Sequence, residues 1–348
     1  MPLLYYLPDE RCVETEETDT ILTSSLYAGI PHIHVCGGSA RCSTCRVWVL
    51  EGLEHCSPRN DAEDHLAKRL CFDPKMRLAC QTQVLGEGKV TVRRLVVDAE
   101  DMSLVEQQLS GQRSAIGEEQ MLAVLFADLR GFTSFSEVLP AYDVIYVLNR
   151  YFSRMGQVIE RYGGIINNYM GDGLMALFGW NCPDRPVERA VRAALEMQTA
   201  MEEFNAYLET LYQRQLKIGI GIHYGSVVVG AVGASPKSQK ITAIGDTVNL
   251  ASRIETANKT VGTSLLVSEA VYQQVQSLIR VGCQCEVSLP GKSGEYRLYE
   301  VIDIAPDAAG AIAPSAQPCK SENPPRLRRV WRWLLQLGKQ VIGIRKLK

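Results

Sequence analysis

The chain has 348 residues, of which 46% are hydrophobic and 22% charged, the composition of a globular protein with enough length for about two domains. It contains no run of about 18 apolar residues and begins without a basic leader and apolar core, so we expect a cytoplasmic protein with neither a membrane-spanning helix nor a secretory signal. The formal net charge is −2, yet residues 326–348 carry eight Lys and Arg and no Asp or Glu, which leaves −10 on the rest. Because that body is acidic, we expect no nucleic acid among its partners.

Eleven cysteines are present, and most of them lie in the first quarter of the chain. An odd number without a secretory signal is typical of metal or cluster binding rather than of a disulfide framework. Cys36, Cys42 and Cys45 have the spacing C-x5-C-x2-C, and Cys80 follows in the stretch RLACQT. A tetrahedral zinc site would usually need a second CxxC pair, whereas the small residues between Cys36 and Cys45 suit a loop around an iron–sulfur cluster. A zinc site or unmodified thiols are the alternatives.

The surroundings of these cysteines, AGIPHIHVCGG and MRLACQ, make residues 1–97 similar to the adrenodoxin-type ferredoxins, which hold a 2Fe–2S cluster. The resemblance implies a β-grasp fold, which is a mixed sheet with a helix packed across it, and a redox partner at this domain. It also implies that the cluster ligands are Cys36, Cys42, Cys45 and Cys80. Apolar residues at helical spacing predict the helix within residues 20–29, and Gly29 is placed to end it.

A polar segment, residues 98–118, separates this domain from the next and contains Gly111 and Gly117. We expect a short helix around residues 101–110, followed by a loop. A change in the redox state of the first domain would have to act on the second through this linker.

The first half of the second domain, which we assign to residues 119–304, predicts a strand, a helix and a hairpin. Residues 121–127 form a continuous apolar run of strand length, which indicates a strand buried on both faces. Residues 141–162 have an apolar stripe at helical spacing, and two glycines follow them. The stretch INNYMGDGLMALFG then predicts a strand, a tight turn around Asp172 and a returning strand.

The second half of this domain begins with residues 186–213, which predict a long amphipathic helix. The stretch LKIGIGIHYGSVVVGAVG predicts two strands joined at Tyr224-Gly225. The resulting order β-α-β-β-α-β describes an α+β fold in which a sheet carries helices on one face.

Two carboxylates gain a common explanation from this order. Asp128 ends the first strand, and Asp172 lies in the turn of a hairpin that should pair beside it. Carboxylates that meet across a turn repel each other unless a divalent cation lies between them, which favours a magnesium site. Gly131 lets the backbone turn and expose N–H groups to phosphate oxygens. The alternative is two surface aspartates that each cap their own turn.

Three motifs in order, FADLRGFTSFSE, YMGDGLMALFG and AIGDTVNLASRIE, make residues 119–304 similar to the catalytic domain of class III adenylate and guanylate cyclases. The resemblance implies a ferredoxin-like βαββαβ core and two divalent metal ions, Mg²⁺ or Mn²⁺, in each active site. The implied metal ligands are Asp128, Asp172 and the carbonyl of Leu129. The implied phosphate-binding backbone is that of Gly131, Phe132 and Thr133.

The third motif adds two catalytic side chains. Asn249 and Arg253 are four residues apart and therefore share one helical face. In the family, the residue matching Asn249 orients the ribose, and the one matching Arg253 stabilises charge on the α-phosphate while the 3′-hydroxyl attacks and pyrophosphate leaves. A solvated helix charge is the alternative for Arg253. Where many members have a triphosphate-binding lysine, SLPGKSG places Pro290, and Lys292 is the candidate nearby.

The base-binding positions point to ATP. Asn168, three residues before Gly171, stands where many adenylate cyclases have lysine and guanylate cyclases have glutamate, and Thr242 stands at the partner position. A threonine hydroxyl can accept a hydrogen bond from the amino group of adenine, and an asparagine amide can donate to a ring nitrogen. A flipped amide can also serve guanine, so GTP is the alternative substrate.

The family works as dimers in which each active site is shared between two domains. Because this chain carries both the metal pair and the Asn/Arg pair, the resemblance implies a homodimer with two equivalent sites. The favoured function is an adenylate cyclase that the redox state of the cluster regulates. An electron carrier or redox sensor whose cyclase-like domain only dimerises and binds nucleotide is the alternative.

The end of the chain changes character. Residues 305–325 are rich in Pro and Ala and predict a flexible linker. Residues 326–348 predict a basic amphipathic helix, which suits a peripheral position on the inner face of a membrane. Docking of this helix on the acidic body of the same protein is the alternative.

Overall fold

The computed structural model describes residues 1–95, 117–233 and 240–305. The chain divides into two compact units, Met1–Ile116 and Gly117–Lys348, and each is described by itself. The helix predicted around residues 101–110 and the basic helix predicted at 326–348 lie outside the described residues. Among the helices that are described, none is both long and apolar enough to cross a membrane.

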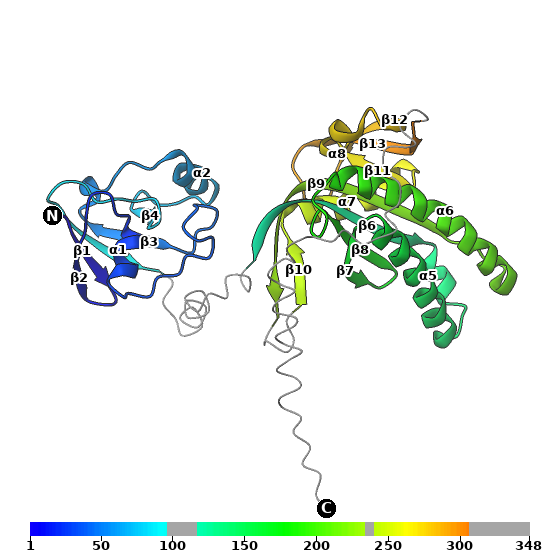
Figure 1. The fold of residues 1–348 in the computed structure, drawn as a ribbon, viewed down its shortest axis with the longest axis horizontal. Helices are drawn as coiled ribbons and strands as arrows, with labels where there is room; N and C mark the ends of the chain where they lie inside the picture. The colour runs from blue at the N-terminus through cyan, green and yellow to red at the C-terminus, as the bar shows by residue number, and fades with distance from the viewer. Residues whose placement is uncertain (96–116, 234–239, 306–348) are drawn as a thin grey trace, which may run out of the picture. The chain divides into compact units, whose positions relative to one another are not determined.

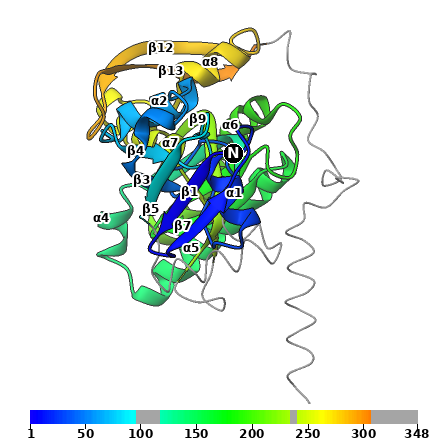
Figure 2. The same cartoon turned by 90° about the vertical axis from the view of Figure 1, so that its left-hand side faces the viewer.

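The N-terminal unit is built on a five-stranded sheet with the order β2-β1-β5-β3-β4, of which Figure 1 labels β2 and Figure 2 labels β5. β1 and β5 run parallel and the other neighbours antiparallel, which gives the mixed sheet expected for a β-grasp. The strands are β1 (Leu3–Leu7), β2 (Arg11–Glu14), β3 (Arg46–Glu51), β4 (Met76–Leu78) and β5 (Lys89–Arg94). The helices are α1 (Ile21–Tyr27), the 3₁₀ helix η1 (Leu53–His55) and α2 (Asp61–Arg69).

Helix α1 forms where the sequence predicts it, within slightly shorter bounds. Thr20 and Thr23 cap its start reciprocally, since the side chain of each accepts a hydrogen bond from the backbone N–H of the other. Ile21 and Leu22 are buried among strand side chains. The chain leaves the helix through Gly29, whose φ of +69° favours glycine.

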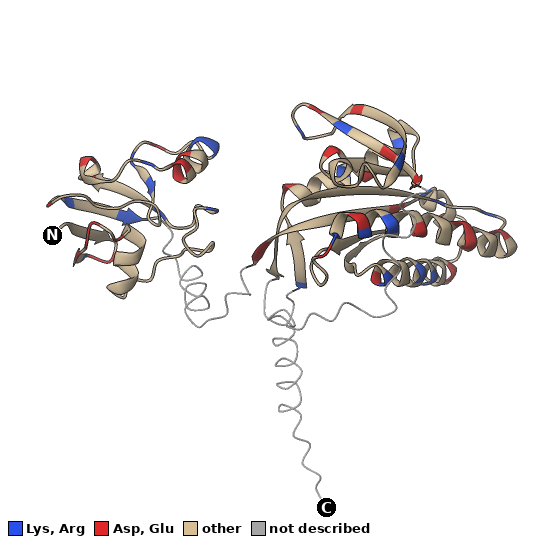
Figure 3. Ribbon diagram, turned by 45° about the horizontal axis from the view of Figure 1, so that its top comes forward, with Lys and Arg blue, Asp and Glu red and all other residues tan. Residues whose placement is uncertain are grey.

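Helix α2 is fixed to the sheet by a buried ion pair. Its first turn is acidic and its last turn basic, which complements the helix dipole (Figure 3). The side chain of Glu63 is 0% exposed and accepts two hydrogen bonds from the guanidinium of Arg77, at 2.9 and 2.8 Å. It also accepts one from the N–H of Leu78 at 2.7 Å. These bonds hold the strand that leads to Cys80.

The C-terminal unit is built on an eight-stranded sheet with the order β12-β13-β11-β9-β6-β8-β7, and β10 pairs with β9 beside this path. β12 and β13 form a long antiparallel hairpin (Figure 2). The strands are β6 (Glu118–Arg130), β7 (Ile165–Met170), β8 (Gly173–Phe178), β9 (Lys217–Val232), β10 (Lys240–Ile244), β11 (Leu265–Ser268), β12 (Ile279–Ser288) and β13 (Glu295–Ile304). The helices are α4 (Phe132–Ser136), α5 (Ala141–Arg161), α6 (Pro186–Tyr212), α7 (Asp246–Val261) and α8 (Glu269–Val275).

The core of this unit follows the predicted βαββαβ order, as β6-α5-β7-β8-α6-β9 with the short α4 inserted. The four strands lie in the order β9-β6-β8-β7, which is the ferredoxin-like arrangement. α5 and α6 lie side by side (Figure 1), and the phenol of Tyr162, just after α5, donates to Glu196 of α6 at 2.8 Å.

Strand β6 is buried on both faces, as predicted. Ala123 and Leu125 pack with side chains of α5 and α6, while Leu122 and Val124 pack in a second cluster with Ala251 of α7. The two helices of the predicted βαββαβ order, α5 and α6, therefore share one face of the sheet, as expected. The second face of β6 and β9 is apolar and must also be covered, and α7 covers it.

Strand β9 is one continuous strand, so the prediction of two strands joined at Tyr224-Gly225 is wrong. It pairs with β6 without a register shift. The glycines that suggested a turn allow the close approach of α7 instead. A Cβ on Gly221 would lie 2.2 Å from the backbone nitrogen of Glu255, and one on Gly225 would lie 2.6 Å from the hydroxyl oxygen of Thr247.

Candidate functional site

Two strands bring Asp128 and Asp172 together. β6 and β8 pair antiparallel with Ala127 opposite Leu174, so the carboxylate of Asp128 lies next to the β7–β8 turn that contains Asp172. A Cβ on Gly173 would lie 3.1 Å from Oδ1 of Asp128, which shows how closely that carboxylate approaches the turn. The hairpin therefore pairs beside Asp128 as the sequence predicts.

The electrostatics of this pair suit a bound cation. Burial, and then the neighbouring Asp128 carboxylate, raise the pKa of Asp172. The ammonium of Lys259, near the end of α7, lies 3.3 Å from Oδ2 of Asp128 and places a positive charge at the site. Across the described residues, no three or more His, Cys, Asp or Glu side chains are placed to hold one ion. A divalent cation would therefore need further oxygens, and the backbone carbonyl of Leu129 and the substrate phosphates are of the required chemistry.

The backbone after β6 turns sharply into α4. Gly131 has a φ of +79° and stands at the start of this short helix. The carbonyl of Gly131 accepts a hydrogen bond from the N–H of Phe135. The N–H groups of Phe132 and Thr133 belong to the first turn, where a helix offers them no partner of its own. The predicted phosphate-binding segment thus follows Asp128 directly in the sequence.

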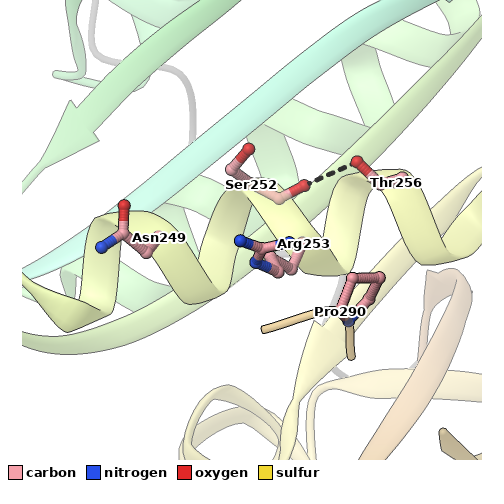
Figure 4. Close-up of a pocket in the computed structure, with 5 residues that line it drawn as sticks. All are labelled: Asn249, Ser252, Arg253, Thr256 and Pro290. Carbon is pink, nitrogen blue, oxygen red and sulfur yellow. Dashed lines mark hydrogen bonds between the residues drawn. The ribbon is translucent and has the colours of Figure 1, made fainter. Parts of the chain in front are cut away.

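Helix α7 presents the Asn/Arg pair to a cavity of about 240 Å³ (Figure 4). Besides Asn249 and Arg253, its lining residues are Ser252, Thr256 and Pro290. A Cβ on Gly291 would lie 3.3 Å from Nη2 of Arg253, so the guanidinium extends to the β12–β13 loop. The two side chains share one helical face, as their spacing predicts.

Within one chain, the carboxylates and the Asn/Arg pair are set apart along α7. Lys259 of α7 contacts Asp128, and Arg253 and Asn249 precede Lys259 by six and ten residues. Because an α-helix rises about 1.5 Å per residue, these positions lie about 9 and 15 Å from Lys259 along the axis of α7. Phosphoryl transfer needs both groups around a single α-phosphate.

Of the two predicted base-binding residues, Thr242 contacts a neighbouring strand and Asn168 is exposed. Thr242, on β10, contacts Asn167 of β7 rather than Asn168, since its hydroxyl lies 3.3 Å from Oδ1 of Asn167. Asn168 is exposed on the same strand. At the other end of the site, Lys292 makes an ion pair with Asp246 at the start of α7. The β12–β13 loop thus places Lys292 close to the α7 cavity.

Sequence reasoning missed three residues of this site. Lys259 contacts Asp128, and Asn167 contacts Thr242. Glu255 lies on the buried face of α7, where burial and then Asp128 raise its pKa to about 7. Helical spacing from Arg253 does not indicate Lys259, because residues six apart do not share a helical face. No local signal could have chosen between two adjacent asparagines.

The four cysteines of the N-terminal unit are arranged as two pairs. The thiol of Cys36 contacts that of Cys42, and the thiol of Cys45 contacts that of Cys80. Within each pair the hydrogen bond lowers the pKa of one thiol, that of Cys36 to about 4 and that of Cys80 to about 7, and raises the pKa of the other. Two pairs, rather than one group of four around a point, fit the two irons of a 2Fe–2S cluster better than a single zinc ion.

Polar groups support this loop. Nε2 of Gln81 donates to the sulfur of Cys80 at 3.3 Å and to the carbonyl of Gly38 at 3.0 Å. The hydroxyl of Thr44 lies 3.2 Å from the sulfur of Cys42. Gly37, Gly38 and Ala40 have positive φ, so the loop curls around the thiols.

Comparison with protein families identifies both units. A profile described as adenylate and guanylate cyclase catalytic domain matches residues 115–302, just over half of the chain. The chain belongs to this family. A second profile, described as 2Fe-2S iron-sulfur cluster binding domain, matches residues 5–85, which include all four paired cysteines. The predicted fusion of a ferredoxin-type domain to a cyclase domain is confirmed, and the N-terminal match supports a 2Fe–2S cluster.

Individual relatives of the cyclase domain include proteins named for either substrate. The chain is 36% identical over 187 residues to an adenylate cyclase of Anabaena cylindrica and 34% identical over 203 residues to adenylate cyclase 1 of Rhizobium meliloti. These matches cover 52% and 58% of this chain but 36% and 30% of the relatives, so the chain matches about a third of their length. Among solved structures, the guanylyl cyclase Cya2 has a TM-score of 0.51 at 34% identity, and the adenylyl cyclase CyaB from P. aeruginosa has 0.51 at 30%. These cover 57% and 55% of this chain and 99% and 98% of those chains.

Proposed function

We propose that the chain is an adenylate cyclase, which converts ATP to 3′,5′-cyclic AMP and pyrophosphate. The observation that carries the proposal is the meeting of Asp128 and Asp172 at the β7–β8 turn, in a unit whose α7 also presents Asn249 and Arg253 to a cavity. Membership of the cyclase family and identity to named adenylate cyclases support it.

Each residue has a distinct part in the proposed reaction. Asp128 and Asp172 would hold two divalent cations, which when bound lower the pKa of the 3′-hydroxyl and neutralise the triphosphate. The backbone from Gly131 onward would donate to phosphate oxygens. Asn249 would orient the ribose, and Arg253 would stabilise the negative charge that develops around the α-phosphorus as pyrophosphate leaves.

The distances along α7 favour a homodimer with shared sites. Arg253, the proposed phosphate-binding side chain of α7, lies about 9 Å along the helix axis from Lys259, which contacts Asp128, so the two halves of the site are set apart along α7. A second copy related by twofold symmetry would supply the missing half to each site and create two equivalent sites.

Activity of the purified holo-protein tests the proposal. With ATP or GTP and Mg²⁺ or Mn²⁺, chromatography of the products should show cyclic AMP forming about 5-fold faster than cyclic GMP, because one misaligned hydrogen bond to the base is worth about 1 kcal/mol. Asp172→Asn should lower the rate at least about 100-fold, whereas the exposed Asp303→Asn should not change it. A holo-protein that forms no cyclic nucleotide would refute the proposal.

Regulation by the cluster is the second part of the proposal. The paired cysteines support a redox-active cluster, and an added electron changes its charge by one unit, which can bias the packing of a dimer. Oxidised and dithionite-reduced protein should therefore differ in rate, with the cluster shown intact by its absorbance. Equal rates would contradict regulation. An electron carrier with an inactive cyclase-like unit is the remaining candidate if the reduced cluster passes electrons but no cyclic nucleotide forms.

A further inference from the structure

A side-chain amide connects the two strands that the base is expected to contact. Asn167 lies at an irregularity of β7, where the pairing with β8 shifts between Ile166 and Asn168. This bulge aims the Asn167 side chain at β10 while Asn168 is exposed. Three groups of β10 surround the amide, and all three belong to consecutive residues.

The contacts fix which way the amide of Asn167 points. Its Nδ2 donates to the carbonyl oxygen of Ile241 at 3.2 Å, and its Oδ1 accepts from the backbone N–H of Ala243 at 3.4 Å. A carbonyl can only accept and a backbone N–H can only donate, so the flipped amide would lose both bonds. Oδ1 therefore faces β10, where the hydroxyl of Thr242 donates to it at 3.3 Å.

The hydroxyl of Thr242 has one proton, and it points to Oδ1 of Asn167 in this hydrogen bond. With that proton committed, the oxygen of Thr242 offers only lone pairs to a third group. The six-position of adenine carries an amino group, which donates, whereas that of guanine carries a carbonyl oxygen, which accepts. An acceptor at Thr242 can take a hydrogen bond from the amino group of adenine, whereas it would face the carbonyl oxygen of guanine, which is another acceptor.

We infer that Asn167 is a positioning residue for base selection: it orders the hydroxyl of Thr242 as an acceptor and so makes the site prefer adenine. The inference rests on the proposed function, because it assumes that Thr242 faces the base. It assigns the preference for ATP to two neutral side chains, one of which need not touch the substrate.

The test compares selectivity, the ratio of kcat/KM for ATP to kcat/KM for GTP, in the full-length holo-protein. Asn167→Ala leaves the hydroxyl free to donate to guanine, so this ratio should fall about 5-fold. Thr242→Val should lower it similarly, and the double variant should lower it no further, because both changes remove the same ordered acceptor. Asn167→Asp retains an acceptor oxygen and should retain the ratio even where the rate falls.

A matched control is available on α6. Asn205 also makes a two-pronged amide contact, donating to the carbonyl of Leu216 at 2.8 Å and accepting from its N–H at 2.9 Å. Asn205→Ala should leave the ratio unchanged. If Asn167→Ala lowers kcat/KM for both substrates equally, or if the double variant loses more selectivity than either single variant, the inference is overturned.

Binding measurements separate this inference from the proposed function. Dissociation constants for α,β-methylene ATP and α,β-methylene GTP, measured by calorimetry with Mn²⁺, should show the same changes in ratio. A chain that forms no cyclic nucleotide but discriminates between these analogues through Asn167 would refute the proposed function alone. If Asn167→Ala binds each analogue with the same affinity as the wild type does, the inference alone is refuted.

Discussion

Complementation between two inactive variants is the sharpest consequence of the geometry of α7. Asp172→Ala removes a carboxylate of the proposed metal site, and Arg253→Ala removes the proposed charge-stabilising group at the α7 cavity. If each site takes its carboxylates from one chain and its Arg253 from the other, a dimer of one variant with the other would contain one site that lacks both groups and one site that lacks neither. Either variant alone would have both of its sites damaged.

The expected recovery of activity follows from the number of intact sites in the mixture. If equal amounts of the two chains pair at random, about half of the dimers are mixed and each has one intact site of two, so the mixture should regain about a quarter of wild-type activity. Each parent should remain at least about 100-fold below wild type. The recovery is thus at least about 25-fold over either parent.

Co-expression with two different affinity tags, followed by purification over both, gives a verified mixed dimer whose cyclic nucleotide formation can be measured directly. It should have about half of wild-type activity. As a control, a chain carrying both Asp172→Ala and Arg253→Ala should inactivate a wild-type partner, since each site of that dimer would lack one group. A verified mixed dimer no more active than its parents, or a half-active control dimer, would refute the shared site.

Three further perturbations follow from single contacts. Glu63→Ala leaves the buried guanidinium of Arg77 without its partner and should lower the free energy of unfolding of the N-terminal unit, measured with denaturant, by about 3–5 kcal/mol. Asp64→Ala, which breaks an exposed pair on the same helix, should change this free energy far less. His223 is kept neutral, since burial lowers its pKa to about 4, so only the unfolded chain takes up its proton between pH 6.5 and 4. As the pH falls from 6.5 to 4, the free energy of unfolding should decrease by on the order of 2 kcal/mol more in the wild type than in His223→Gln. Parallel pH profiles of the two proteins would contradict this. Lys259→Ala removes the ammonium that competes for the metal site and should raise the affinity for Mn²⁺, measured by electron paramagnetic resonance, about 2- to 5-fold.

Most of the fold could be predicted from the sequence because its signals are local. The apolar run of β6, the stripes of α5 and α6 and the turn at Asp172 each depend on residues within one element or hairpin, and they place the two carboxylates correctly side by side. The cysteines are also mainly a local signal, because three of the four lie in one loop and only Cys80 comes later in the chain.

The errors have a common physical cause, which is packing between elements distant in sequence. Gly225 resembles a turn signal, yet it serves the approach of α7, which begins more than twenty residues later. The contact of Asn167 with β10 was not foreseen for a similar reason, since a bulge of β7 decides on which side of the strand this residue lies. Neither the facing helix nor the bulge can be read from local spacing.

The close packing of α7 suggests how a distant signal could reach both halves of the site. With no Cβ on Gly221, the backbone of α7 rests directly on β9, so the helix is held as a rigid piece of the sheet. It carries Arg253 at the cavity and Lys259 at the carboxylates, so their spacing within one chain is fixed. In a twofold dimer, what can vary is the placement of one rigid unit against the other, and any such change alters both shared sites at once. A charge change at the cluster would therefore need only to bias the pairing of the two copies, without contacting a catalytic group.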